Sequence, residues 1–362
     1  MNTNVVTPWS TVGYLTMKRT YARRLNETDL NSKTEEFTDV VDRVVKATND
    51  QLGCDFSKAE QERLRGYLLG LKGIVAGRFL WQLGTPTVDK LGLASLQNCA
   101  FTVIDKPVEP FTWAMDLLML GSGVGYNIQR KNVDKLPIIN TGFVRPTRID
   151  TADASFIVPD SREGWVKLLG KTLKAAFLSD SDNGCTFTYS TQLIRGKGAP
   201  IKGFGGTASG PEDLCNGINN ISNVLEKRKG KKLRPIDCLD IMNIIGSIVV
   251  AGNVRRSAQI AIGDADDVEY LLAKRWDMGN IPSWRAMSNN SVVCDDISDL
   301  HEFFWDGYEG KGEPYGLINL KLSRKVGRLG ETEYPDPKVQ GYNPCAEQSL
   351  ADKETCCLAE IY

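Results

Sequence analysis

Short β-prone runs alternate with helical segments from about Leu96 onward, and this alternation restricts the fold more than any other feature of the chain. Apolar residues recur at helical spacing between Leu214 and Leu225, and Pro235 begins a second helical segment that extends to about Val250. The strand-like runs are residues 100–104, 186–189, 259–262, 291–293 and 315–319. An α/β fold is therefore predicted, although the alternation alone allows several α/β architectures.

The first ninety or so residues have a different pattern, which is mostly helical. Leu64, Leu68, Leu71 and Val75 recur at helical spacing, which predicts a helix that includes Val75. A chain of 362 residues is long enough for about two domains. We therefore expect an N-terminal helical region at 1–95 and an α/β body at 96–362. Within that body, residues 132–161 have the weakest periodicity and are predicted to be an insertion or a long surface excursion.

The overall charge excludes some classes of partner. The chain has 44 Lys and Arg against 45 Asp and Glu, a formal net charge of -1, so it has no general attraction to nucleic acid or to an anionic membrane. The basic run at 227–234 is interpreted as the solvated end of a helix. No apolar run is long enough to span a bilayer, and the first residues do not resemble a signal peptide. These features predict a cytoplasmic protein with neither a membrane nor a nucleic acid partner.

The cysteines are more typical of reactive thiols than of structural disulfides. Nine cysteines, an odd number in a long chain without an export signal, are expected to be mostly reduced thiols, so any disulfide is predicted to be a working one. One histidine, His301, and the absence of a CxxC pair leave too few ligands for a zinc site, and no metal site is predicted.

Three chemically useful side chains lie on alternate residues near the end of the chain. Asn343, Cys345 and Glu347 would point to one face of an extended backbone, where one substrate could meet all three. A nucleophile, an acid/base group and a redox pair could be assembled from these residues together with Cys99 and Cys356. The alternative is a structural cysteine beside surface polar residues, and the spacing alone leaves both open.

Two glycine-rich segments invite comparison with nucleotide-binding loops. Residues 203–211 contain four glycines, then hydroxyls, then a proline suited to a helix start, a composition that can form an anion cradle or a flexible turn. Residues 121–125 lack the last glycine of a dinucleotide fingerprint, and no strand is predicted closely before them. They are interpreted as a packing turn.

The region around Cys345, with residues 354–360, resembles the active-site finger loop of ribonucleotide reductases, in particular the adenosylcobalamin-dependent (class II) ribonucleoside-triphosphate reductases. Eight further motifs occur in the order of that family. They begin at Lys18, Gly77, Asn98, Gly123, Asp160, Gly203, Ala251 and Ser288. The likeness therefore extends along nearly the whole chain.

The resemblance implies roles for the residues around the finger loop. Cys345 would become a transient thiyl radical that removes the 3′ hydrogen of the ribose, Glu347 would take the 3′-hydroxyl proton, and Asn343 would hold the ribose hydroxyls. Cys99 and Cys356 would supply two electrons and form a disulfide, to be reduced again by a thioredoxin-like partner. Cys357 is interpreted as a spare thiol, with a vicinal disulfide to Cys356 as the alternative.

The resemblance also implies bound nucleotides. Residues 203–211 resemble the first loop of a specificity site for a deoxynucleoside triphosphate effector, and residues 252–257 resemble the second loop, which communicates with the substrate base. The effector and substrate residues so implied are Gly205, Gly206, Thr207, Ser209, Asn253, Arg255, Arg256, Asn98 and Thr85. The implied substrate is a ribonucleoside triphosphate and the implied cofactor is adenosylcobalamin.

The fold implied by the resemblance is a ten-stranded α/β barrel with the finger loop at its centre. The family's catalytic chain is about twice as long, so this chain would supply the N-terminal helical region, the first half of the barrel and the finger loop. A second polypeptide supplying the other half is the expected partner, and an interrupted gene or a truncated record would explain the length equally well. An isolated half-barrel exposes a strand edge and an apolar face, which predicts poor solubility or association.

Alternative functions remain at this point. One is the large subunit of a class I ribonucleotide reductase, which takes its radical from a separate subunit, although Pro344 and residues 204–211 favour class II. Another is a non-catalytic module that binds deoxynucleoside triphosphates, which the intact set of cysteines disfavours. A generic thiol oxidoreductase would need a CxxC pair, and a glycyl-radical enzyme would not need the paired thiols.

Overall fold

The computed structural model describes residues 9–26, 31–178, 186–199, 207–251 and 257–362. The chain divides into two compact units, one formed by Met1–Asn98 with Cys356–Tyr362 and the other by Cys99–Thr355. The sequence-based boundary after residue 95 lies three residues before the end of the first stretch. Each unit is described below by itself.

The first unit consists mainly of short helices around a small apolar core. The valines of α2 (Phe37–Asp50) are buried in this core, and α3 (Lys58–Leu69) begins at a capping box in which Ser57 and Glu60 bond each other's backbone N–H. The remaining helices are α1 (Thr11–Thr20), α4 (Gly77–Gln82), α5 (Pro86–Leu91) and a 3-10 turn at Leu93–Leu96. A mostly helical N-terminal region is therefore observed.

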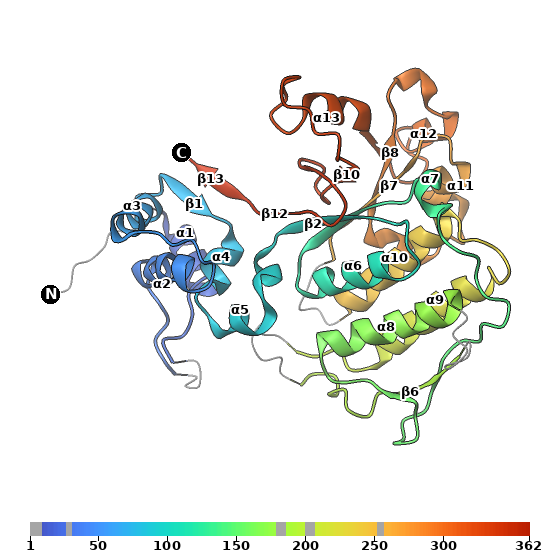
Figure 1. The fold of residues 1–362 in the computed structure, drawn as a ribbon, viewed down its shortest axis with the longest axis horizontal. Coiled ribbons are helices and arrows are strands. Elements are labelled where there is room, and N and C mark those ends of the chain that lie inside the picture. The colour runs from blue at the N-terminus through green and yellow to red at the C-terminus, as the bar shows by residue number, and fades with distance from the viewer. Residues whose placement is uncertain (1–8, 27–30, 179–185, 200–206, 252–256) are drawn as a thin grey trace. The chain divides into compact units, whose positions relative to one another are not determined.

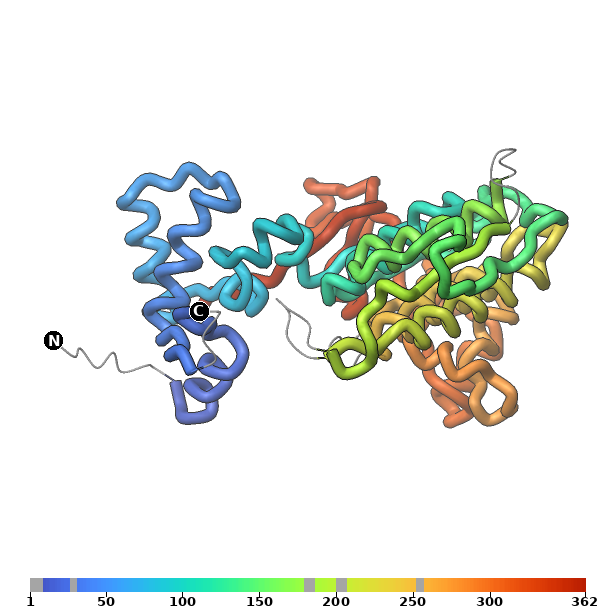
Figure 2. The backbone as a smooth tube through the Cα atoms, turned by 90° about the horizontal axis from the view of Figure 1, so that it is seen from below, coloured from blue at the N-terminus to red at the C-terminus, as the bar shows by residue number. Residues whose placement is uncertain are grey.

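One strand of this unit contradicts the predicted helix. Val75 lies in β1 (Gly73–Val75), because α3 ends at Leu69 and Leu71 takes a φ of 51°. β1 pairs antiparallel with β13 (Ala359–Ile361), so the last residues of the chain lie among the first hundred (Figures 1 and 2). Local periodicity could not indicate this pairing, since the two strands are far apart in the sequence.

A six-stranded sheet organises the second unit, and its strand order is β12-β2-β3-β7-β8-β9. The bounds are β12 (Thr355–Cys356), β2 (Cys99–Val103), β3 (Gly123–Asn127), β7 (Gln259–Asp264), β8 (Asn289–Val293) and β9 (Gly316–Ile318). The strands from β2 to β9 are parallel, and Cys99 is in register with Gly123. Residues on both faces of β2, β3, β7 and β8 are buried, as expected for a parallel sheet, whereas Gly316 and Leu317 of the edge strand β9 are exposed.

Two layers of helices cover one face of this sheet (Figure 1). α6 (Glu109–Met119) and α10 (Pro235–Val250) pack against the strands, and α8 (Arg162–Phe177) and α9 (Glu212–Glu226) pack on those helices. α10 is apolar on almost all sides because it lies between the sheet and α9. The predicted helices at 214–225 and from Pro235 to Val250 are confirmed.

The segment 132–161 is not a loose surface excursion. Leu136, Phe143 and Val158 are fully buried, and β4 (Thr147–Arg148) and β5 (Phe156–Ile157) pair with β6 (Thr188–Ser190) in a three-stranded sheet. The remaining elements are α7 (Arg130–Val133), α11 (Val268–Leu271), α12 (Glu302–Asp306), α13 (Leu320–Val326), β10 (Gly341–Tyr342) and β11 (Ser349–Leu350). None of the helices in the described ranges has the length and apolar character that a bilayer crossing requires.

The glycines at 121–125 are only partly a turn. Gly121 has a φ of 83° and ends the turn after α6, but Gly123 and Gly125 lie within β3. The predicted packing turn is therefore wrong for these two residues. Because Gly123 and Gly125 have no side chain, another segment of the chain can approach them closely, as described below.

Candidate active site

A short hairpin lies across the sheet on the side away from α6 and α10 (Figure 1). It consists of β10 and β11, paired antiparallel, with residues 343–348 as its tip. β10 runs antiparallel to β3: the Gln340 carbonyl accepts a 2.8 Å hydrogen bond from Asn127 at the carboxyl end of β3, and Pro344 lies against Gly123 at its amino end. The hairpin therefore carries its tip to the amino edge of the sheet.

The tip brings together two of the three predicted residues. Asn343 is buried, its Nδ2 donates to Glu347 Oε1 at 2.6 Å, and its Oδ1 accepts from the Gln348 backbone N–H at 3.1 Å. The extended backbone expected here is wrong, because the chain turns at 344–348 and Ala346 takes a φ of 63°. Asn343 and Glu347 meet across this turn and not along one face of a strand.

Cys345 is an exposed free thiol at the tip of the hairpin. It follows Pro344, whose ring lies against Gly123, and Gly123 is the register partner of Cys99. Cys345 and Cys99 therefore lie at the same edge of the sheet, where β2 and β3 begin. The sequence alone placed these two thiols more than two hundred residues apart.

Cys99 and Cys356 are both partly buried. The division between the two units passes between Asn98 and Cys99 and again between Thr355 and Cys356, so each thiol belongs to a different unit. Their pairing therefore remains an expectation that the family resemblance implies.

Cys357 lies in the first unit with local partners. Its Sγ donates to the Leu96 carbonyl at 3.3 Å and to Gln97 Oε1 at 3.2 Å. Burial of the sulfur raises the pKa of the Cys357 thiol, while the Asn98 backbone and the charge of Arg78 oppose this rise. A thiol with a raised pKa is a weaker nucleophile at neutral pH, which supports the interpretation as a spare thiol.

Two predicted substrate or effector residues lie in the first unit. Thr85 is the N-cap of α5, where its buried hydroxyl donates to the Gln82 carbonyl at 2.7 Å and accepts from the Thr87 N–H at 3.3 Å. This hydroxyl already has a structural role. Asn98 lines a cavity of about 230 Å³ together with Tyr21, and its Oδ1 is buried without a hydrogen-bond partner among the described residues.

The predicted effector loops are only partly described. Gly205, Gly206, Asn253, Arg255 and Arg256 lie outside the described residues. Thr207 is exposed and Ser209 is half-buried. They flank Ala208, which exchanges backbone hydrogen bonds with Gly198 and Ala199. α9 begins directly after Pro211, as the composition of this segment suggested.

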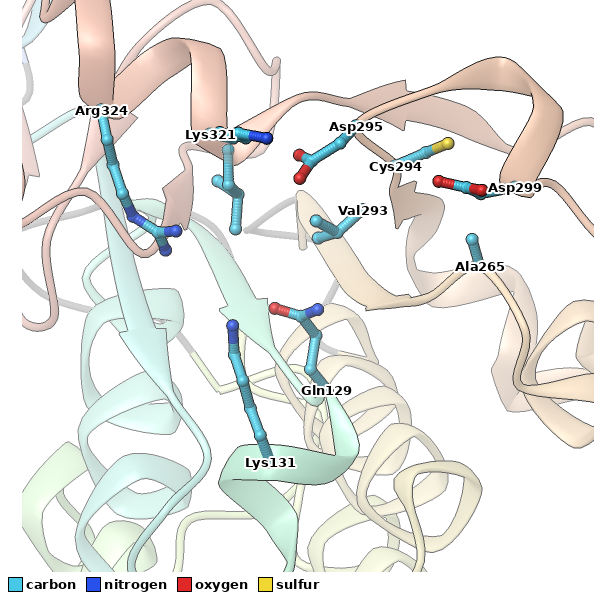
Figure 3. Close-up of a pocket in the computed structure, with 10 residues that line it drawn as sticks. Gln129, Lys131, Ala265, Val293, Cys294, Asp295, Asp299, Lys321 and Arg324 are labelled. Atoms are coloured by element: carbon cyan, nitrogen blue, oxygen red, sulfur yellow. The ribbon is translucent and has the colours of Figure 1, made fainter.

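A second cavity, of about 510 Å³, lies at the opposite, carboxyl edge of the sheet. Lys131 and Arg324 line one side of it, and Asp299 and Cys294 line the other (Figure 3). Sequence reasoning did not single out these residues, since they lie in separate stretches of the chain: α7, the segment after β8, and α13. The lining mixes cations and carboxylates, so its charge does not indicate one class of ligand.

The family comparison agrees with the resemblance found in the sequence. Residues 128–225 match the family described as "B12-dependent ribonucleotide reductase, insertion domain". This match contains the segment 132–161, for which an insertion was predicted.

Curated relatives and a solved structure match the chain over nearly its whole length. The adenosylcobalamin-dependent ribonucleoside-triphosphate reductases of Lacticaseibacillus paracasei and Lactobacillus leichmannii are each 34% identical, over 98% of this chain and 54% of their own. The chain thus spans about half the length of these relatives. A crystal structure of a B-12 dependent (class II) ribonucleotide reductase aligns with a TM-score of 0.84 at 31% identity, covering 98% of this chain and 56% of that one.

Proposed function

The chain is a homologue, over nearly its whole length, of adenosylcobalamin-dependent ribonucleoside-triphosphate reductases, and from this premise we propose that it supplies the finger-loop half of such an enzyme. The proposed reaction converts a ribonucleoside triphosphate into the 2′-deoxyribonucleotide for DNA synthesis in the cytoplasm. The observation that carries the proposal is the hairpin tip, which presents an exposed thiol beside an amide-bound carboxylate at the edge where Cys99 also lies.

The proposed chemistry assigns one task to each group. As a thiyl radical, Cys345 takes the 3′ hydrogen atom of the ribose, and Glu347 takes the proton of the 3′-hydroxyl. The 2′-hydroxyl then leaves as water. Cys99 and Cys356 together give two electrons and two protons and become a disulfide, and Cys345 returns the hydrogen atom to C3′. The net change is one ribonucleotide and two thiols converted into one deoxyribonucleotide, one disulfide and one water.

The cofactor fits what the hairpin presents. The Cys345 thiol is exposed, so a large organic group can approach it without unfolding the tip. Adenosylcobalamin, when bound, supplies the radical that removes the hydrogen atom from this thiol. This chain's own contribution is to hold the thiol at a fixed height above the sheet, with the Glu347 carboxylate held two residues away by Asn343.

The proposed architecture is half of a ten-stranded α/β barrel. The parallel strands of the second unit form that half, and the hairpin lies on the face that the other half would close over. The other half and the remaining cofactor contacts come from a further polypeptide or chain segment. The proposed deoxynucleoside triphosphate effector binds at the loops near 203–211 and 252–257, and a thioredoxin-like protein reduces the disulfide.

A reductase assay tests this proposal. The mixture contains adenosylcobalamin, a ribonucleoside triphosphate, a dithiol and an effector, and it is run on this chain alone and with the polypeptide that supplies the other half. We expect deoxyribonucleotide only with both parts, and none with Cys345→Ser, while the matched variant Cys54→Ser, at an exposed thiol of the first unit, keeps full activity. Inactivity of the assembled enzyme with intact cofactor would reject the proposal.

The same assay separates the alternative functions. Effector binding without any turnover would favour the non-catalytic module. Turnover that requires a separate radical-generating subunit in place of adenosylcobalamin would favour class I. The aligned alpha subunit of a class Id reductase from Actinobacillus ureae has a TM-score of only 0.44, so it adds no support to that alternative.

A further inference from the structure

Two glycines of β3 have an unusual relation to the finger hairpin. A Cβ built on Gly125 would lie less than 3.0 Å from the Tyr342 carbonyl oxygen, and a Cβ on Gly123 would likewise lie less than 3.0 Å from Cγ of Pro344. Gly123 and Gly125 are two residues apart in a strand, so both missing side chains belong to the same face of the sheet. Neither residue has a positive φ, so the backbone conformation does not require glycine.

The hairpin also contributes a glycine to this close contact with the sheet. Gly341, in β10, faces Phe101 of β2, and a Cβ there would overlap the aromatic ring. Gly341, Gly123 and Gly125 are all buried. The hairpin therefore lies nearer to the sheet than side chains would permit, along a track from which the Cβ atoms are missing on both sides.

The ends of this track are held by polar contacts. At the base of the hairpin, Asn127 donates to the Gln340 carbonyl at 2.8 Å, and the Tyr342 hydroxyl shares a hydrogen bond with Ser323. At the other end the Pro344 ring lies on Gly123, and Cys345 is the next residue. Because the base is fixed, a side chain beneath Tyr342 or Pro344 has to lift the part of the hairpin that carries the thiol.

We propose that Gly123 and Gly125 are positioning residues for Cys345, because the track they form sets the height of the thiol above the sheet. The proposal rests on the proposed function in that Cys345 is taken as the reacting thiol. Ordinary contact with a Cβ begins at 3.4 Å, so an added methyl group displaces the hairpin by about 1 Å or more. A misplacement of this size costs roughly 100-fold in the rate of a reaction between held groups.

A structural role alone is the competing explanation, and the sheet provides a matched control. Gly263 lies in β7, and a Cβ there would lie 2.5 Å from the ring of Tyr270, away from the hairpin. Gly263→Ala therefore introduces the same methyl group into the same sheet with a comparable clash. It should lower the melting temperature as Gly125→Ala does, without moving Cys345.

The experiment compares Gly123→Ala, Gly125→Ala and Gly263→Ala in this chain. The first readout is the rate of iodoacetamide labelling at Cys345, followed by peptide mass spectrometry, with the melting temperature measured alongside. The second is kcat and KM in the assembled enzyme. We expect the labelling rate to change several-fold and kcat to fall roughly 100-fold for the two β3 variants, but not for Gly263→Ala at an equal loss of melting temperature.

A second substitution provides a rescue that a general loss of stability would not show. Pro344→Ala removes the atom that clashes with a side chain at position 123, so it should restore the labelling rate of Gly123→Ala toward that of Pro344→Ala alone. It should not restore Gly125→Ala, whose clash is with a backbone oxygen. This double variant also keeps the test informative if Gly125→Ala does not fold.

The outcomes separate this proposal from the proposed function. Equal labelling rates in all three glycine variants, or no rescue by Pro344→Ala, would overturn the positioning role whatever the activity. If the labelling rate at Cys345 changes in the two β3 variants but not in Gly263→Ala, and the assembled enzyme still shows no turnover, the proposed reaction is rejected. The positioning role is then still supported.

Discussion

Asn343 donates a 2.6 Å hydrogen bond from Nδ2 to Oε1 of Glu347 across the turn that carries Cys345. The same amide accepts a hydrogen bond from the Gln348 N–H through its Oδ1, and the residue is completely buried. One side chain thus closes the hairpin tip and fixes the direction of the carboxylate. Its two functions can be separated by substitution.

Asn343→Ala is expected to destabilise the chain. It removes the acceptor of the Gln348 N–H and leaves a cavity at a buried position, so the free energy of unfolding should fall by about 1–3 kcal/mol. Chemical denaturation measures this change. Asn216→Ala, at an exposed position of α9, serves as the control and should change stability little. Equal stabilities of the two variants would contradict the role assigned to Asn343.

Glu347→Gln is expected to affect activity and not stability. The new side chain can still accept the hydrogen bond from Asn343, but it cannot take a proton, so kcat in the assembled enzyme should fall roughly 10²- to 10⁴-fold. The matched control is Glu333→Gln, at an exposed position between α13 and β10. Retention of more than a tenth of the activity would argue against Glu347 as the general base.

The proposed redox pair predicts a specific disulfide. After one turnover without external reductant, peptide mass spectrometry should find Cys99 joined to Cys356, with Cys357 free. Cys99→Ser and Cys356→Ser should each abolish repeated turnover, because two thiols are needed to form the disulfide that releases two electrons. A disulfide between Cys356 and Cys357 would support the vicinal alternative instead.

The Cys357 thiol is expected to need a higher pH than an ordinary cysteine thiol to become reactive. Burial raises its pKa, so at pH 8 the reactive thiolate is a smaller fraction than in an ordinary thiol, and the labelling rate should still be rising above the ordinary pKa. Iodoacetamide labelling between pH 7 and 10, with quantification of the Cys357 peptide, measures the profile. The same chain unfolded in urea is the reference, and coinciding profiles would contradict the assignment.

The local pattern of the chain was enough to predict α9 and α10, two of the helices in the layers that cover the sheet, but α6 and α8 were not predicted. α10 was predicted from Pro235 to Val250 because a proline at its start and a mostly apolar composition are signals within one segment. The chemistry of Cys345 and Glu347 was likewise proposed from their residue types and from the resemblance of the surrounding motif. Each of these inferences depends on residues close together in the sequence.

What only the tertiary structure decided is how distant segments meet. The spacing of Asn343, Cys345 and Glu347 suggested a strand, but the pairing of β10 with β11 makes the segment a turn. Gly125 was predicted to lie in a turn, but in the structure it lies directly against Tyr342, which is more than two hundred residues later in the sequence. Helical periodicity reports contacts between residues three or four apart, whereas strand pairing and the approach of the hairpin depend on contacts between remote residues, which local spacing does not encode.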